Sequence, residues 1–199
     1  MSKIAIEGNA SGTGTFTIAS PNSNSSRTLS LPDGTGTFVV NGINSSIVSG
    51  TAVASTSGTS IDFTGIPSWV KRITVMFNGV STNGSSSPLV QLGTSGGVVT
   101  SGYGGTGSLI ASTVTSQNFT TGFGERSQDS AAVRSGAWVI TNVSGNIWVC
   151  AGVLGRSDGA NTSVTGGTVT LGGTLDRVRI TTVNGTDTFD AGTINILYE

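Results

Sequence analysis

The sequence contains no histidine and only one cysteine, Cys150. Without histidine, the chain cannot form a Ser-His-Asp triad, a Cys-His pair or a histidine-based metal site. One cysteine cannot form an all-thiolate zinc site, and Cys150 lies in a strand-like stretch, which predicts a buried free thiol. These absences predict a chain with no metal and no cofactor.

Charged residues are also scarce, at 10% of the chain with a formal net charge of −1. No cluster of lysine and arginine is present, so no nucleic-acid partner is expected. No apolar run approaches the ~20 residues of a membrane-spanning helix, so no membrane span is expected.

The ten acidic residues are scattered. A glycosidase would need two converging carboxylates. Asp187 and Asp190 are close in sequence, but they flank a strand end and its turn, where aspartate usually makes local hydrogen bonds. We therefore expect a protein that is not an enzyme.

The chain is instead rich in glycine, serine, threonine and β-branched residues, with 31 glycines. No stretch combines helix formers with a helical period over three turns. From residue 61 onward, short apolar runs alternate with turn signals at the spacing of a β-sandwich or jelly roll. The predicted fold class is all-β, with an antiparallel sandwich or jelly-roll-like distal domain after a thin β arm.

The stretch 61–79 has the densest strand pattern in the first half of the chain. Trp69, Ile73, Val75 and Phe77 are predicted to share one face, and Asn78-Gly79 is predicted to end the strand in a turn. The three tryptophans are predicted to be core residues: Trp69, Trp138 and Trp148.

A second stretch, 179–181, echoes residues 72–74, and the two are interpreted as strands of one sheet. Asp62 is expected to cap or to pair with Lys71 or Arg72. The remaining predicted strands are 88–92, 137–141, 147–153, 169–171, 176–183, 186–189 and 193–198. Polar loops are predicted at 80–87 and 155–167, a turn at 190–192, and the least regular part at 93–134.

Three regions are predicted along the chain. Residues 1–42 form a thin β arm for attachment and oligomerisation, 43–60 form a linker or an extended crossing strand, and 61–199 form the distal β domain. The arm has too few large apolar residues to fold alone. It therefore needs to pack on the next domain or on other copies. Its oligomerisation candidates are Phe16, Ile18, Leu29, Leu31 and Phe38.

Candidate receptor contacts are placed in the region 93–134 and in the loop 156–161. Binding residues gather on loops held by a rigid scaffold, and aromatic residues and arginine supply most of the binding energy at such surfaces. The alternative is that Phe119 and Phe123 are core residues and the charges are solvated. The candidates are Tyr103, Phe119, Phe123, Arg126, Asp129 and Arg134.

Three long strings carry a resemblance to a known family. GTGTFTIASPNSNSSRTLSLPDGTGTFVV resembles a segment that recurs in bacteriophage tail-fibre proteins. SGTSIDFTGIPSWVKRITVMFNGVSTNGSSSPLVQLG and LDRVRITTVNGTDTFDAGTINILYE resemble the C-terminal domain of phage and prophage tail fibres.

This resemblance implies a non-enzymatic virion structural protein, a homotrimer exposed on the particle. The arm would attach to another virion structural protein, and the distal domain would contact host-surface polysaccharide or protein. Because the opening methionine is close to the first Gly-Thr-Gly strand, attachment to the tail or to the capsid stays open. The alternatives are a capsid (head) decoration or head-fibre protein that stabilises the particle and, third, a polysaccharide depolymerase.

Overall fold

The computed structural model describes residues 11–14, 24, 26, 47–126, 129–130 and 132–199. The chain divides into two units, Met1–Phe38 and Val39–Glu199, and the strands described below all belong to the second. The five oligomerisation candidates of the arm, Phe16, Ile18, Leu29, Leu31 and Phe38, lie outside the described residues.

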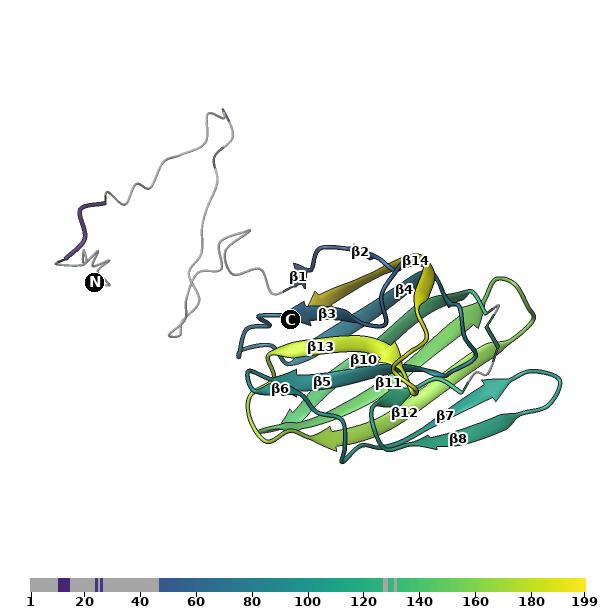
Figure 1. The fold of residues 1–199 in the computed structure, drawn as a ribbon. Helices are drawn as coiled ribbons and strands as arrows, with labels where there is room; N and C mark the ends of the chain where they lie inside the picture. The colour runs from purple at the N-terminus through teal and green to yellow at the C-terminus, as the bar shows by residue number, and fades with distance from the viewer. Residues whose placement is uncertain (1–10, 15–23, 25, 27–46, 127–128, 131) are drawn as a thin grey trace. The chain divides into compact units, whose positions relative to one another are not determined.

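The described part of the second unit consists of strands and connecting turns, as predicted, and all strand pairings are antiparallel (Figure 1). No described helix is long and apolar enough to cross a membrane. The abundance of Val, Ile and Thr explains the strands, because branched side chains pack well on a pleated surface.

The larger sheet has nine strands. Eight follow the order β1-β14-β4-β10-β11-β12-β7-β8, and β2 also pairs with β14. Their bounds are β1 (Val48–Ser49), β2 (Val53–Ala54), β4 (Arg72–Thr82), β7 (Gly104–Ile110), β8 (Thr115–Phe119), β10 (Arg134–Ser144), β11 (Ile147–Arg156), β12 (Thr162–Thr170) and β14 (Phe189–Tyr198).

The smaller sheet has five strands, in the order β3-β13-β5-β6, with β9 also paired to β5. Their bounds are β3 (Ile61–Thr64), β5 (Pro88–Thr94), β6 (Gly97–Val98), β9 (Phe123–Gly124) and β13 (Arg177–Thr182). One hydrophobic cluster contains buried residues of both sheets, so the two sheets form a sandwich.

Alternation along the strands explains the core between the sheets. Ile73, Val75 and Phe77 point inward from β4, and Val178 and Ile180 point inward from β13; all are buried. Each such side chain contributes about 1.5–3 kcal/mol relative to exposure. The rings of Phe77 and Trp138 lie 5.4 Å apart at the centre of this core.

The predicted pairing of the two echoing stretches in one sheet is wrong. Residues 72–74 begin β4 in the larger sheet, whereas 179–181 lie in β13 of the smaller sheet. In both stretches apolar and polar residues alternate, because each strand turns one face toward the shared core. A similar pattern therefore shows a similar environment and does not specify a shared sheet.

Two predicted turns are bulges inside strands. β4 continues through Asn78-Gly79 to Thr82, and Gly79 has a φ of +64° where the register with β10 and β14 shifts. β14 likewise continues through 190–192, where Gly192 has a φ of +96°. Asn-Gly supplies the positive φ of a hairpin turn, but a glycine bulge uses the same conformational freedom.

Other boundaries differ because polar strands were mistaken for loops. β12 occupies residues 162–167 of the predicted loop 155–167, and β6 to β9 lie in the irregular region 93–134. In the predicted strand 186–189, only Phe189 belongs to a strand, β14. Residues 48–54 pair as β1 and β2 with β14, which agrees with the crossing-strand alternative for 43–60. The hairpin of 137–141 with 147–153 is confirmed as β10 and β11.

Two of the three tryptophans are core residues, as predicted, and Cys150 is a buried free thiol. Trp69 corrects the prediction, because it lies before β4 and is 47% exposed, 6.0 Å from the ring of Tyr198. Asp62 pairs with Arg179 on the neighbouring strand β13, at 2.7 and 2.8 Å, and not with Lys71 or Arg72.

Candidate functional site

The β domain has two distinct ends. At the near end, Val48 pairs with Tyr198, so Ile47 lies beside the C-terminus and the start of β4. At the far end, Thr162 at the start of β12 pairs with Gly155 near the end of β11 and with Ile110 at the end of β7. The β7–β8 and β11–β12 connections therefore lie at the same end of the sheet. The start of β10 lies there too, because Arg134 is opposite Arg156.

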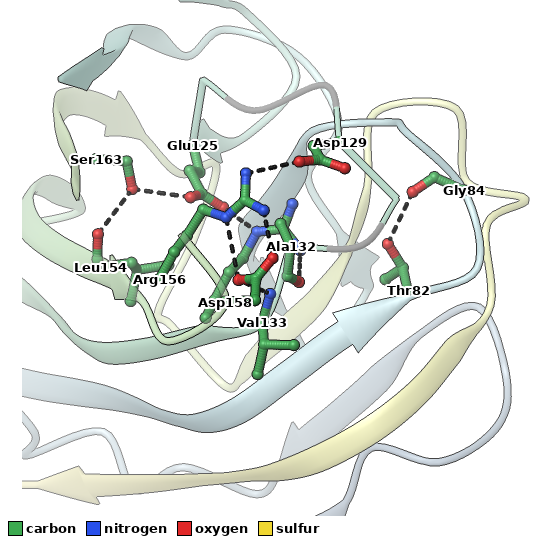
Figure 2. A network of polar contacts seen from close by, with 11 residues as sticks. Thr82, Gly84, Glu125, Asp129, Ala132, Val133, Leu154, Arg156, Asp158 and Ser163 are labelled. Carbon is green, nitrogen blue, oxygen red and sulfur yellow. Dashed lines mark hydrogen bonds and ion pairs between the residues drawn. The ribbon is translucent and has the colours of Figure 1, made fainter. Parts of the chain in front are cut away.

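Arg156 links two connections at the far end (Figure 2). Its guanidinium contacts Asp129 at 2.8 Å and also pairs with Asp158. Only 8% of the Arg156 side chain is exposed, whereas 48% of Asp129 is. The hydrogen bond to Asp158 and the nearby carboxylates raise the pKa of Arg156 above its usual range. The same hydrogen bond holds the pKa of Asp158 well below its usual range.

Backbone contacts complete this link. Val133 donates its N–H to Asp158 Oδ1 at 2.9 Å, and Ser157 donates its N–H to the Val133 carbonyl at 3.1 Å. The residues before β10 and after β11 are thus joined by charge and by main-chain bonds. Contacts of this kind restrict the two connections, and a restricted surface has a lower ordering cost on binding.

A buried ion pair lies beneath these loops. Arg134 Nε donates to Glu125 Oε2 at 2.5 Å, and both side chains are almost fully buried. Arg134 Nη1 donates to the Ala132 carbonyl, and Ser163 Oγ donates to Glu125 Oε1 at 2.9 Å (Figure 2). Buried charges are tolerated when they are paired and hydrogen-bonded in this way. The pair anchors both ends of the connection from β9 to β10.

The predicted receptor contacts separate into two groups. Tyr103, Phe119, Phe123 and Arg134 are buried, so the prediction that they contact a receptor is corrected, and the core alternative holds for Phe119 and Phe123. Tyr103 packs edge-on against Phe123 at 5.1 Å, and its hydroxyl accepts the Leu92 N–H at 2.7 Å. Burial raises its pKa to about 12.

Arg126 and Asp129 remain at the surface of the far end, partly exposed. The loop 156–161, predicted together with them, supplies Arg156, which contacts Asp129, and Asp158, which pairs with Arg156. An arginine, carboxylates and loop hydroxyls can exchange hydrogen bonds with sugar hydroxyls or with polar protein groups. In the parts of the chain that the structure describes, no group of acidic or cysteine side chains could hold a metal ion.

Sequence reasoning missed Glu125 and the central position of Arg156. Glu125 follows a two-residue strand, so no alternation marks it as an interior position. Its only sequence signal is a carboxylate nine residues before Arg134, in a stretch that also contains Arg126 and Asp129. Pairing across that distance depends on the path of the chain and not on a local period.

Asp187 and Asp190 both make hydrogen bonds within the fold, but only Asp187 has a partner in its own turn, as the turn interpretation predicted. Asp187 accepts the Ser86 N–H at 2.8 Å and the Asn184 side-chain amide at 2.6 Å. Asp190 accepts the hydroxyl of Ser81. Both carboxylates therefore connect β14 or its preceding turn to β4 and the following loop.

Comparison of the chain with models of protein families, with curated proteins and with solved structures finds no match.

Proposed function

We propose that the chain is a non-enzymatic structural protein of a bacteriophage virion, a trimeric tail fibre whose β domain contacts the host surface through its far end. The observation that carries the proposal is that the two ends of the β domain differ. Ile47, which follows the N-terminal segment, lies at one end, and the loops braced by Arg156 lie at the other. A domain attached at one end and presenting cross-linked loops at the other fits an exposed fibre tip.

Three further points support the proposal. The strings at 12–40, 57–93 and 175–199 resemble phage tail-fibre segments. The N-terminal residues have too small an apolar content to fold alone, so association between copies and attachment to another virion protein supply their partners. The carboxylates of Asp187 and Asp190 are engaged in hydrogen bonds that join elements of the fold, which favours binding over polysaccharide cleavage.

The experiment is a binding assay of the labelled full-length protein on intact cells of candidate host strains. Replacing Arg126 with alanine should weaken saturable binding at least tenfold, because an arginine at the far end is lost. Lys71→Ala removes a cation at the near end and should bind as the wild type does. Both variants should keep the wild-type circular dichroism spectrum.

The capsid alternative gives the opposite pattern. A protein that binds purified phage heads tightly and no host strain would be a decoration protein, and the fibre proposal would fall. Equal loss of cell binding in Arg126→Ala and Lys71→Ala would also contradict recognition by the far end.

A further inference from the structure

The central part of the outward face of the larger sheet carries exposed valines and no charge, and the ion pair of Arg72 with Glu199 lies at its edge. On β10, β11 and β12, the inward residues such as Trp138, Cys150 and Leu154 are buried, so their neighbours point away from the core. These neighbours include the exposed valines Val139, Val149, Val153 and Val164, with Val153 at 50%. We define the neutral face by the outward residues Thr74, Met76, Ala137, Val139, Thr141, Val149, Ala151, Val153, Val164, Thr168 and Leu197.

Strand register makes the neutral face continuous. Ala137 lies opposite Met76 on one side and Val153 on the other, and Val153 lies opposite Val164. The next row runs from Leu197 through Thr74 and Val139 to Ala151. The rows therefore cross five neighbouring strands without an interruption by a charged side chain.

The outward face of the smaller sheet is chemically different. Asp62 and Arg179 form an exposed ion pair there, and Arg177 beside them pairs with Asp176. By contrast, residues 135–155 and 159–175, which include nearly all of β10, β11 and β12, contain no charged residue. Such a difference between two faces of one sandwich indicates that water covers one and protein covers the other.

We propose that the neutral faces of the three copies in the proposed trimer meet around its three-fold axis, each packing against the other two, which deepens the self-association included in the proposed function. A partner with charges at this surface would leave them buried and unpaired, at a high energetic cost. When identical copies meet through the same surface, each charge on it would face a like charge. The neutral face avoids this repulsion because its residues are uncharged.

The size of the neutral face can be compared with that of known interfaces. Strand spacing of ~4.8 Å gives a width of roughly 19 Å from β14 to β12, and four outward positions on β11 give a length of roughly 20 Å. The projected area of roughly 400 Å² is in the range of the largest apolar patches on monomers, which are often functional. A standard interface covers ~800 Å² per partner, so residues that border the neutral face complete the contact.

The position of Ile47 agrees with this arrangement. Ile47 is 53% exposed and lines a shallow cleft with Thr74 and Leu197, at the border of the neutral face. The paired Arg72 and Glu199 line the same cleft, so this border is charged. Packing of the copies through this face brings the residue at which each N-terminal segment joins its β domain to the border of the shared interface.

The test replaces Val153 with lysine in the full chain, and sedimentation velocity measures self-association. The expected result is a multi-chain wild type and at least a tenfold weaker association in Val153→Lys. Val183→Lys, at a valine that is also exposed but lies between β13 and β14, should associate as the wild type does. Circular dichroism and tryptophan emission confirm folding, and Val164→Lys serves as a second variant if Val153→Lys does not fold.

The other outcomes overturn the proposal in distinguishable ways. If a folded Val153→Lys keeps the wild-type mass but Phe38→Asp dissociates it, the oligomer of the proposed function survives and the neutral face is not its interface. A single-chain wild type overturns both proposals. In that case protease cleavage is compared between the wild type and Val153→Lys. Faster cleavage within residues 1–46 of the variant would show that the N-terminal segment of the same chain covers the neutral face.

Discussion

Glycine residues in the core of the sandwich make room for large aromatic rings. A Cβ added at Gly152 would overlap Cδ1 and Cγ of Trp138, which is fully buried on the neighbouring strand β10. The ring cannot move away without disturbing Phe77, its neighbour at 5.4 Å. Gly152 is therefore needed for its small volume, since its own φ is not in the left-handed region.

Gly152→Ala should lower the free energy of unfolding by about 1–3 kcal/mol, because overpacking displaces a buried ring. The matched control is Gly155→Ala on the same strand, where the nearest atom to an added Cβ is the Ser135 carbonyl oxygen at 3.9 Å. Urea denaturation followed by tryptophan emission compares them. Equal stability of the two variants would show that Trp138 can relocate freely.

The buried pair of Glu125 and Arg134 should be far more sensitive than the exposed pair of Arg72 and Glu199. Glu125→Ala leaves the Arg134 guanidinium buried without its carboxylate, at a cost of about 3–5 kcal/mol. Glu199→Ala should cost about 0–1 kcal/mol, because exposed pairs are screened by water. Chemical denaturation of both variants measures this difference, and similar losses would contradict the proposed anchoring role.

Two buried groups should make the domain sensitive to alkali. Burial raises the pKa of Cys150 and of Tyr103 to about 12. Since both pKa values are higher in the folded state, the native chain holds these protons more tightly. The resulting stability is complete below the ordinary pKa values, near 9 and 10, and is lost as pH rises toward 12.

Unfolding free energy should therefore fall above pH 9, by about 1.4 kcal/mol per pH unit for each group that titrates only in the unfolded chain. Cys150→Val removes the thiol and should reduce this slope between pH 9 and 10, while stability at pH 7 changes little. Urea denaturation at several pH values gives both slopes. An unchanged slope in the variant would contradict the assignment to Cys150.

At the scale of elements, the far-end connections depend on the Asp158 carboxylate. Asp158→Asn should weaken the contacts to Arg156 and to the Val133 N–H, so amide hydrogens near Val133 and Ser157 should exchange faster. Global stability should change little, because Asp158 is partly exposed. Asp62→Asn on the smaller sheet is the control, with faster exchange confined to β3 and β13.

Acid should act on the same contact. Because the pKa of Asp158 is lowered in the folded chain, its contribution is present above the ordinary value near 4 and is lost only as pH falls well below it. Protection of these amides at pH 4, corrected for intrinsic exchange rates, should match that at pH 7. Loss of protection already at pH 4 would contradict the strength of the link to Arg156.

Element type could be predicted from the sequence more accurately than element pairing. The alternation in 72–77 and in 177–182 correctly predicted strands, because burial on one face leaves a period of two. Neither stretch contains information about which sheet it joins, so their pairing was predicted wrongly. Residues 162–167 of β12 were predicted as loop, because Gly166-Gly167 and the small polar residues beside them hide the alternation of Ser163, Thr165 and Val169. The end of the same strand was correctly predicted within 169–171.

The candidate site was only partly predictable for the same physical reason. The two regions 93–134 and 156–161 were named together, and Asp129 and Arg156 bring them into contact. The sequence did not indicate which aromatic residues would be exposed. A glycine has no side chain, so a ring from a neighbouring strand can pack over it and become buried. Phe119, for example, packs where Gly124 has no side chain.

At the scale of the whole molecule, the two faces of the sandwich have different roles in our account. The charged face of the smaller sheet remains exposed to water, and the neutral face of the larger sheet packs against other copies of the chain. The far end, braced by Arg156 and by the buried Glu125–Arg134 pair, is left accessible. Association, presentation and attachment thus use separate parts of one β domain and its N-terminal segment.

The most direct test of this account is the mass of the full-length wild-type protein in solution, measured by light scattering after size-exclusion chromatography at micromolar concentration. We predict a mass about three times the 19.9 kDa of one chain. A mass of one chain, with a folded β domain, would contradict the central claim that this protein works as a multi-copy structural unit.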